Sequence, residues 1–111
     1  MAIRIVERPA DQLSPVSLPA RVEVFQILRS TKTSEKVTIK YSLPEQDEVR
    51  FDGSATTVTR DETISRADTP LRHRLQLIRL KGKGTIQLTI DETITTESGG
   101  TQPTSFDIVV S

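Results

Sequence analysis

The stretch KVTIKYSL, residues 36–43, alternates apolar and polar side chains without a break. In an extended chain its apolar side chains share one face and its polar side chains share the other: Val37, Ile39, Tyr41 and Leu43 against Thr38, Lys40 and Ser42. This period of two is typical of a strand that buries one face and leaves the other in water. The stretch therefore predicts an antiparallel sheet whose apolar face covers a core.

Four further stretches alternate in the same way: residues 21–28, 48–51, 85–91 and 105–110. In the first of them, the adjacent pair Val24-Phe25 predicts a bulge that turns Ile27 inward. The second ends at Asp52-Gly53, a dipeptide suited to the positive φ of a tight turn. A weaker polar strand at 55–59 is expected to pair back on it. The loop-like composition of residues 97–103 predicts that the last two stretches form an antiparallel hairpin.

Residues 70–81 allow two interpretations. Thr69 as N-cap, Pro70 in the first turn and Gly82 past the end suit a helix. A strand instead places alternate residues on one face, namely Leu71, His73, Leu75 and Leu77. We favour the strand, because a lone helix in an all-β chain needs a docking face and the sandwich would lose a central strand.

The chain has 111 residues, which fits one domain with one core. Three prolines, Pro9, Pro15 and Pro19, predict that residues 1–20 form an extended N-terminal segment, to which Ile3 and Ile5 can add an edge strand at 2–6. Residues 21–111 are then the sandwich domain. The predicted fold class is all-β, an antiparallel immunoglobulin-like β-sandwich of seven or eight strands.

Two local patterns resemble the fibronectin type III family. Val37-Thr-Ile-Lys-Tyr41 followed by Pro44 is similar to the family's second strand, where tryptophan stands in place of Tyr41. Leu80-Lys-Gly-Lys-Gly-Thr-Ile86-Gln-Leu-Thr-Ile90 resembles the family's turn into its penultimate strand, with the same spacing from Leu80 to Ile86. The resemblance covers about residues 20–110 and implies a fibronectin type III-like sandwich. Ile86 replaces the family's corner tyrosine, so the hydroxyl bond that braces this turn cannot form.

Composition excludes several classes of function. Fifteen basic and fifteen acidic residues balance, so no overall charge points to nucleic acid. No cysteine is present, which excludes disulfides and thiolate sites. No apolar run approaches the roughly 20 residues of a membrane span, and residues 1–12 lack a signal-peptide core. We expect no membrane insertion, and a cytoplasmic protein as written or an extracytoplasmic one if the chain was excised from a longer secreted protein.

No set of residues predicts catalysis or a cofactor. His73 is the sole histidine, no nucleophile elbow accompanies it, and the alternation places it inward. One histidine, one methionine and no cysteine cannot complete a transition-metal site. Acidic residues at Glu45, Asp47, Glu48 and Asp52 suit calcium, but their spacing forms no calcium loop, and we favour the interpretation that they are solvated loop and edge charges. We therefore expect no enzyme, no resident metal and no cofactor.

Basic residues gather between Arg66 and Lys83, where six positive side chains face one acid, Asp68. The candidate binding face comprises Arg72, Arg74, Arg79, Lys81 and Lys83. It is interpreted either as a grip on an anionic partner or as a solubilising surface paired with acidic strands beside it. Residues 45–52 are acidic, so pairing of this segment with the basic face of a second copy, in head-to-tail self-association, is a further interpretation.

These observations favour a non-catalytic protein-interaction or adhesion and assembly module. The partner is expected to be a protein or a second copy, met through loops at one end or through an exposed edge strand. The alternative is an accessory ligand- or calcium-binding domain that uses the acidic loops. Carbohydrate is disfavoured, because one tyrosine, three phenylalanines and no tryptophan leave little for a stacking platform.

Overall fold

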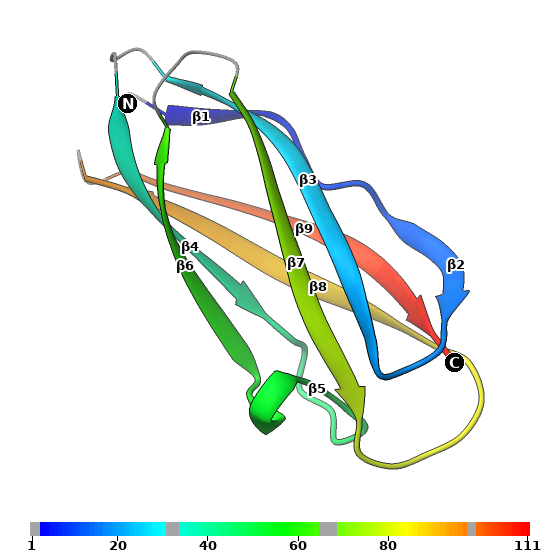
Figure 1. Ribbon diagram of the computed structural model, residues 1–111. Coiled ribbons are helices and arrows are strands. Elements are labelled where there is room, and N and C mark those ends of the chain that lie inside the picture. Colours follow the sequence, from blue (N-terminus) through cyan, green and yellow to red (C-terminus); the bar gives the residue numbers. More distant parts are fainter. Residues whose placement is uncertain (1–2, 31–33, 65–68, 98–99) are drawn as a thin grey trace.

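The computed structural model describes residues 3–30, 34–64, 69–97 and 100–111 (Figure 1). In these ranges the chain forms nine strands and one short 3-10 turn. They are β1 (Ile3–Glu7), β2 (Gln12–Val16), β3 (Ala20–Ser30), β4 (Glu35–Ser42), β5 (Val49–Phe51), η1 (Asp52–Ser54), β6 (Thr57–Ile64), β7 (Thr69–Arg79), β8 (Ile86–Thr96) and β9 (Thr101–Val110). A four-stranded sheet, β1-β3-β7-β5, packs on a five-stranded sheet, β2-β9-β8-β4-β6. The predicted all-β sandwich is confirmed, and the count exceeds eight because the N-terminal segment supplies two strands.

The core lies between the inner faces of both sheets. The decisive stretch forms β4, in which every second residue from Glu35 to Tyr41 is buried. Its inward side chains meet apolar residues of the other central strands, including Val24, Leu75, Ile90 and Ile108. Burial of an aliphatic side chain contributes about 1.5–3 kcal/mol, so this alternation supplies most of the driving force for packing the layers.

Residues 70–81 form the strand β7 rather than a helix. β7 pairs antiparallel with β3 over nine consecutive residues, from Thr69 opposite Leu28 to Leu77 opposite Ala20. Its inward residues are buried as expected, His73 among them. The long β3 offers a backbone partner to each residue, and this long-range pairing outweighs the local helix signals.

Two details of the sequence prediction are wrong. No bulge interrupts the pairing of β3 with β7, so Gln26 and Leu28 point inward and Ile27 stays half-buried. Of the polar strand expected at 55–59, Ala55 forms an isolated antiparallel bridge with Phe51 of β5, whereas residues from Thr57 on form the longer β6, which pairs with β4. The hairpin of the last two stretches is confirmed as β8 and β9, which extend further toward their turn than expected. Residues 98–99 of the predicted loop lie outside the described residues.

The N-terminal segment divides between the two sheets. β1 pairs antiparallel with β3 at the edge of the four-stranded sheet. The chain then crosses over, and β2 pairs in parallel with β9 at the edge of the five-stranded sheet. Segments at opposite ends of the sequence therefore lie side by side (Figure 1). In the described part of the chain, no helix has the length and hydropathy needed to cross a bilayer.

The four-stranded sheet is incomplete on the side of β5. This strand has three residues, and its pairing with β7 is limited to Leu77–Arg79. The chain then turns away at η1, where Gly53 has a φ of 77° that glycine adopts without strain. Among the described residues, no strand pairs with residues 72–76 of β7 on the side away from β3. We call this side of residues 72–76 the β7 edge.

Candidate functional site

The β7 edge presents backbone groups that belong to alternate residues. Directly after β7, the Leu80 N–H donates to the Glu48 carbonyl on the β5 side, at 2.6 Å. Because successive residues of a strand direct their backbone groups to opposite sides, the even-numbered residues of β7 point away from β3. Arg72, Arg74 and Gln76 therefore face this edge. The backbone of Pro70 also points away from β3, so the absence of its N–H removes no hydrogen bond between β7 and β3.

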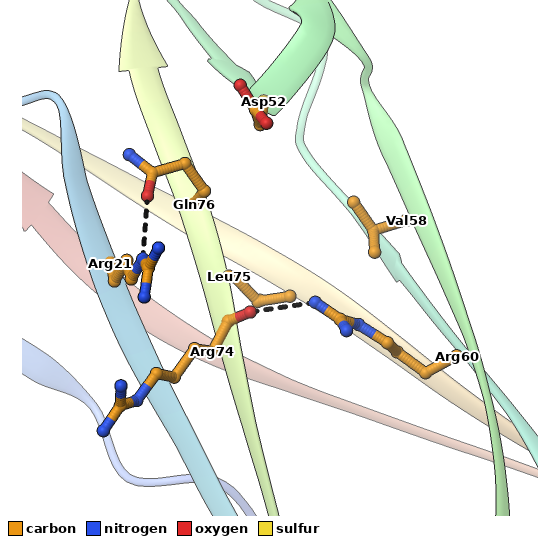
Figure 2. Close-up of a pocket in the computed structure, with 7 residues that line it drawn as sticks. All are labelled: Arg21, Asp52, Val58, Arg60, Arg74, Leu75 and Gln76. Atoms are coloured by element: carbon orange, nitrogen blue, oxygen red, sulfur yellow. Dashed lines mark hydrogen bonds between the residues drawn. The ribbon is translucent and has the colours of Figure 1, made fainter.

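A groove of about 360 Å³ runs along the β7 edge (Figure 2). Its walls come from β3, η1, β6 and β7, namely Arg21, Asp52, Val58, Arg60, Arg74, Leu75 and Gln76. Arg60 reaches across from β6, and its Nη2 donates to the Arg74 carbonyl at 2.9 Å. At the other end, Arg21 Nε donates to Gln76 Oε1 at 3.3 Å. The groove thus joins the outer face of the four-stranded sheet to the space between the sheets.

The inner face of β6 is incompletely covered beside this groove. Ile64 is fully buried, whereas Val58 and Glu62 are half-buried and Arg60 is exposed, although all four share one face of the strand. The difference follows from the short β5, because a longer strand in its place would lie over these side chains. The four-stranded sheet therefore leaves part of the inner face of β6 uncovered on this side.

Two of the predicted site residues lie on the outer face beside the β7 edge. Arg72 and Arg74 are exposed, and the guanidinium carbon of Arg72 lies 5.2 Å from the centroid of the Phe25 ring. This cation–π contact holds Arg72 against the sheet. Glu23 lies directly across from Arg74 in the pairing of β3 with β7. Arg21 and Arg60, which the sequence analysis did not single out, join them around the groove.

The other predicted residues lie on the turn after β7 and meet the acidic loop. Arg79 Nη2 bonds Glu48 Oε2 at 2.9 Å, and Lys81 Nζ bonds Asp47 Oδ2 at 2.6 Å. The hydrogen bond from Lys81 lowers the pKa of Asp47 and raises that of Lys81. Lys83 is exposed on the same turn. The opposite charges of these two segments thus meet within the chain, and Arg79 and Lys81 are less available to a partner than Arg72 and Arg74.

The acidic loop shows no arrangement of metal ligands. Within residues 3–30, 34–64, 69–97 and 100–111, no three side chains of histidine, aspartate or glutamate gather as a metal site requires. Asp47 and Glu48 are engaged by basic side chains instead.

A polar chain crosses the core behind the groove. The Tyr41 hydroxyl lies 2.7 Å from His73 Nδ1, and His73 Nε2 lies 3.0 Å from Glu62 Oε1. Since a carboxylate only accepts, Nε2 carries the proton and the neutral Nδ1 accepts from Tyr41. Burial lowers the pKa of His73, against the opposing effect of Glu62, and burial raises that of Tyr41. The hydroxyl belongs to a fully buried residue, so it cannot meet a substrate while the core is closed.

A buried carboxyl lies beside this chain. Glu92 has no exposed surface, and its Oε2 accepts a hydrogen bond of 3.2 Å from Gln26 Nε2. In the described part of the molecule the second oxygen of each side chain, Glu92 Oε1 and Gln26 Oε1, has no partner. Burial raises the pKa of Glu92, although the neighbouring polar groups of Tyr41 and Gln26 oppose the rise. A sequence signal did exist, because both residues occupy inward positions of alternating strands.

The strand order decides the fold family. β1, β3, β7 and β5 follow the A-B-E-D order of one immunoglobulin sheet, and β9, β8 and β4 follow the G-F-C order of the other. The chain is an immunoglobulin-like β-sandwich. β6 extends the second sheet next to β4, where variable-type domains carry an additional strand.

Solved structures with a similar fold have low sequence identity to this immunoglobulin-like chain. An apo-form Calx CBD1 domain is 12% identical, with 99% of this chain and 96% of that chain covered and a TM-score of 0.48. A lipoprotein from Bacteroides thetaiotaomicron is 17% identical, with coverage of 96% and 77% and a TM-score of 0.47. An ASH/PapD-like domain of human CEP192 is 10% identical, with coverage of 98% and 83% and a TM-score of 0.46. No protein-family model and no curated protein matches the sequence.

Proposed function

We propose that this sandwich is a non-catalytic protein-interaction module that binds an extended segment of a partner as an added strand along the β7 edge. The observation that carries the proposal is the incomplete four-stranded sheet. Backbone groups of Arg74 and Gln76 face a groove, and β5 pairs with β7 only beyond Gln76. An extended segment in this groove continues the line of β5, and main-chain hydrogen bonds supply its affinity.

The β6 edge is a weaker candidate for the same role. Leu43 N–H donates to the Thr56 carbonyl, so by alternation the even-numbered residues of β6 bond β4 and Thr57, Thr59, Asp61 and Thr63 face outward. The inward face of β6 carries the charged Arg60 and Glu62, and both already contact β7. Inward-pointing charges are a known protection of edge strands against pairing.

The expected complex is small and reversible. Each hydrogen bond to the edge contributes about 0.5–1.5 kcal/mol net, and a five-residue edge offers few of them. An interface of this size belongs with transient encounters rather than with permanent assemblies. The burial of Tyr41 and His73 supports a binding role over catalysis, because neither the hydroxyl nor the imidazole is open to a substrate.

Proline substitution on each edge tests the proposal. Gln76→Pro removes an N–H that faces the groove and leaves the ladder with β3 intact, whereas Thr59→Pro does the same on the β6 edge. Random dodecapeptides displayed on phage are selected on the wild-type protein, and the affinities of the selected peptides are measured on both variants. We expect Gln76→Pro to weaken binding at least about tenfold and Thr59→Pro to leave it unchanged.

The folded state of both variants is checked by circular dichroism and thermal unfolding. Should Gln76→Pro not fold, amide chemical-shift changes on peptide addition replace it, and they are expected at Arg72, Arg74 and Gln76. Selected peptides that bind both proline variants as tightly as wild type, or shifts confined to β6, refute the proposal. Failure to select any peptide that depends on Gln76 refutes it as well.

A further inference from the structure

We infer that the segment bound at the β7 edge carries acidic side chains at two alternate positions with an apolar side chain next to them. This inference rests on the proposed strand addition and specifies the chemistry of the partner. Its basis is the difference between the two sides of the groove: arginines lie on the outer face, whereas the apolar side chains of Leu75 and Val58 line the inner side together with Arg60 (Figure 2).

Strand geometry assigns each partner side chain to one side of the sheet. Residues directly opposite each other in paired strands project from the same face, with Cβ atoms about 4.5–5.5 Å apart. Partner residues opposite Arg72 and Arg74 therefore lie on the outer face with them. Partner residues opposite His73 and Leu75, which are buried, project between the sheets.

The outer face selects for negative charge. Arg72, Arg74 and Arg21 lie on it. Glu23 lies across from Arg74 in the pairing of β3 with β7, and Asp52 of η1 is the acid among the residues that line the groove. The guanidinium of Arg72 is already held over Phe25, so less conformational entropy is lost when it binds a carboxylate. Arginine pairs with a carboxylate through two parallel hydrogen bonds, which a lysine or amide side chain in the partner cannot accept.

The inner position beside Leu75 selects for an apolar side chain. Leu75 and the half-buried Val58 line the groove there beside Arg60, whose guanidinium is bound to the Arg74 carbonyl, and the apolar surface of Leu75 and Val58 is covered when an aliphatic side chain enters. Glu62 is bound to His73 and therefore lies beside the partner residue opposite His73. A carboxylate on that partner residue would be repelled by the like charge of Glu62. The two faces thus require the same alternation, acidic outward and apolar inward.

Arg60 occupies the place of a partner amide. Its Nη2 donates to the Arg74 carbonyl, the acceptor that the N–H of an added strand would use. Arg60 is exposed, so it can withdraw and leave the carbonyl to the partner. Removal of its side chain frees this acceptor in advance, and Arg60→Ala is therefore expected to bind the partner segment tighter than wild type.

The test uses nine-residue blocked peptides of one length and spacing. The first alternates Val and Glu, Thr-Thr-Val-Glu-Val-Glu-Val-Thr-Thr, and the others replace both Glu by Gln or by Lys. Affinities are measured by calorimetry at low and at moderate salt. We expect the Glu peptide to bind at least about tenfold tighter than the Gln peptide, and to weaken as salt rises. The Lys peptide is expected to bind weakest.

Charge-reversal variants of the protein test which arginines select the acidic side chains of the peptide. Arg74→Glu and Arg72→Glu are expected to reverse the preference between the Glu and Lys peptides, whereas the matched control Lys83→Glu, on the turn after β7, leaves it unchanged. Equal binding of the Glu and Gln peptides, both lost in Gln76→Pro, refutes acidic selection and retains strand addition. Glu-peptide binding that survives Gln76→Pro refutes strand addition. If none of the three peptides binds, while the binding of phage-selected peptides depends on Gln76, the alternation of acidic and apolar residues is refuted and strand addition is retained.

Discussion

The buried carboxyl of Glu92 makes the stability of this fold depend on pH, and a single substitution is expected to remove that dependence. Glu92 Oε2 accepts from Gln26 Nε2, while Glu92 Oε1 and Gln26 Oε1 have no partner in the described structure. A proton on Glu92 Oε1 supplies the donor that Gln26 Oε1 lacks, so a protonated Glu92 can make two hydrogen bonds with Gln26. Ionisation instead leaves a buried charge whose polar neighbours, Tyr41 and Gln26, are both neutral, at a cost of several kcal/mol.

The sign of the effect follows from the raised pKa of Glu92. The full contribution of Glu92 to the free energy of unfolding is present below its ordinary pKa of 4.5. It is lost as pH rises through the higher pKa of the folded state. Within that window the free energy of unfolding falls by up to about 1.4 kcal/mol for each pH unit. His73 acts in the opposite direction. Burial lowers its pKa, so its contribution is complete above 6.5 and is lost as pH falls below that value.

Glu92→Gln isolates the first effect, because a glutamine amide keeps a donor and an acceptor for Gln26 and needs no proton. Urea unfolding followed by circular dichroism, from about pH 5 to about pH 8, gives the free energy of unfolding of each protein. We expect the free energy of unfolding of the variant to rise steadily relative to that of the wild type as pH increases. The pH-dependent contributions of His73 and the surface acids are the same in both proteins, so they cancel in the difference. Glu92→Ala is expected to lose about 2–4 kcal/mol throughout, from the cavity and the unpaired Gln26. Identical pH profiles of wild type and Glu92→Gln refute the reasoning.

Three further predictions concern stability and are checked by thermal or urea unfolding. Gly84→Ala places a Cβ in open space at a φ of 82° and is expected to cost about 1 kcal/mol. Gly82→Ala is expected to cost more, because its Cβ would lie 2.7 Å from the Glu48 carboxyl and displace the ion pair with Arg79; equal costs contradict this. A double-mutant cycle on Glu48 and Arg79 is expected to give a coupling of about 0.5–1 kcal/mol that weakens in salt, and zero coupling at low salt contradicts it. Ile39→Ala is expected to cost about 2–5 kcal/mol, since Ile39 is fully buried, and a cost below that of Ile39→Val contradicts close packing.

The layers of this fold could be predicted from the sequence wherever apolar residues alternate without exception. β4 is the clearest case, and its inward residues are those that the period of two indicated. The same rule failed in β3 because Gln26 occupies an inward position. The adjacent apolar pair Val24-Phe25 suggested a bulge and a change of face, whereas Gln26 keeps the inward position and its amide nitrogen donates to Glu92 of the opposite sheet. A sequence does not show such pairing across sheets.

β6 was harder to predict for a similar reason. Two of its four inward positions carry charges, Arg60 and Glu62, and these charges are tolerated because the four-stranded sheet does not extend over them. The groove depends on the same incomplete coverage, which follows from how far β5 runs along β7 rather than from any local motif. Arg72 and Arg74 were visible as basic residues of one strand face. Their relation to Arg21 and Arg60 required the pairing of β3 with β7 and the packing of the two sheets.

The parallel pairing of β2 with β9 bears on how the chain folds. Val16 lies opposite Val110, and the Ser111 N–H donates to the Val16 carbonyl at 2.9 Å, so nearly the whole chain must be looped before these contacts exist. The β8–β9 hairpin needs only a short closure, and loop-closure entropy grows with the length enclosed. We expect the β8–β9 hairpin to form early during folding and the β2–β9 pairing to form last.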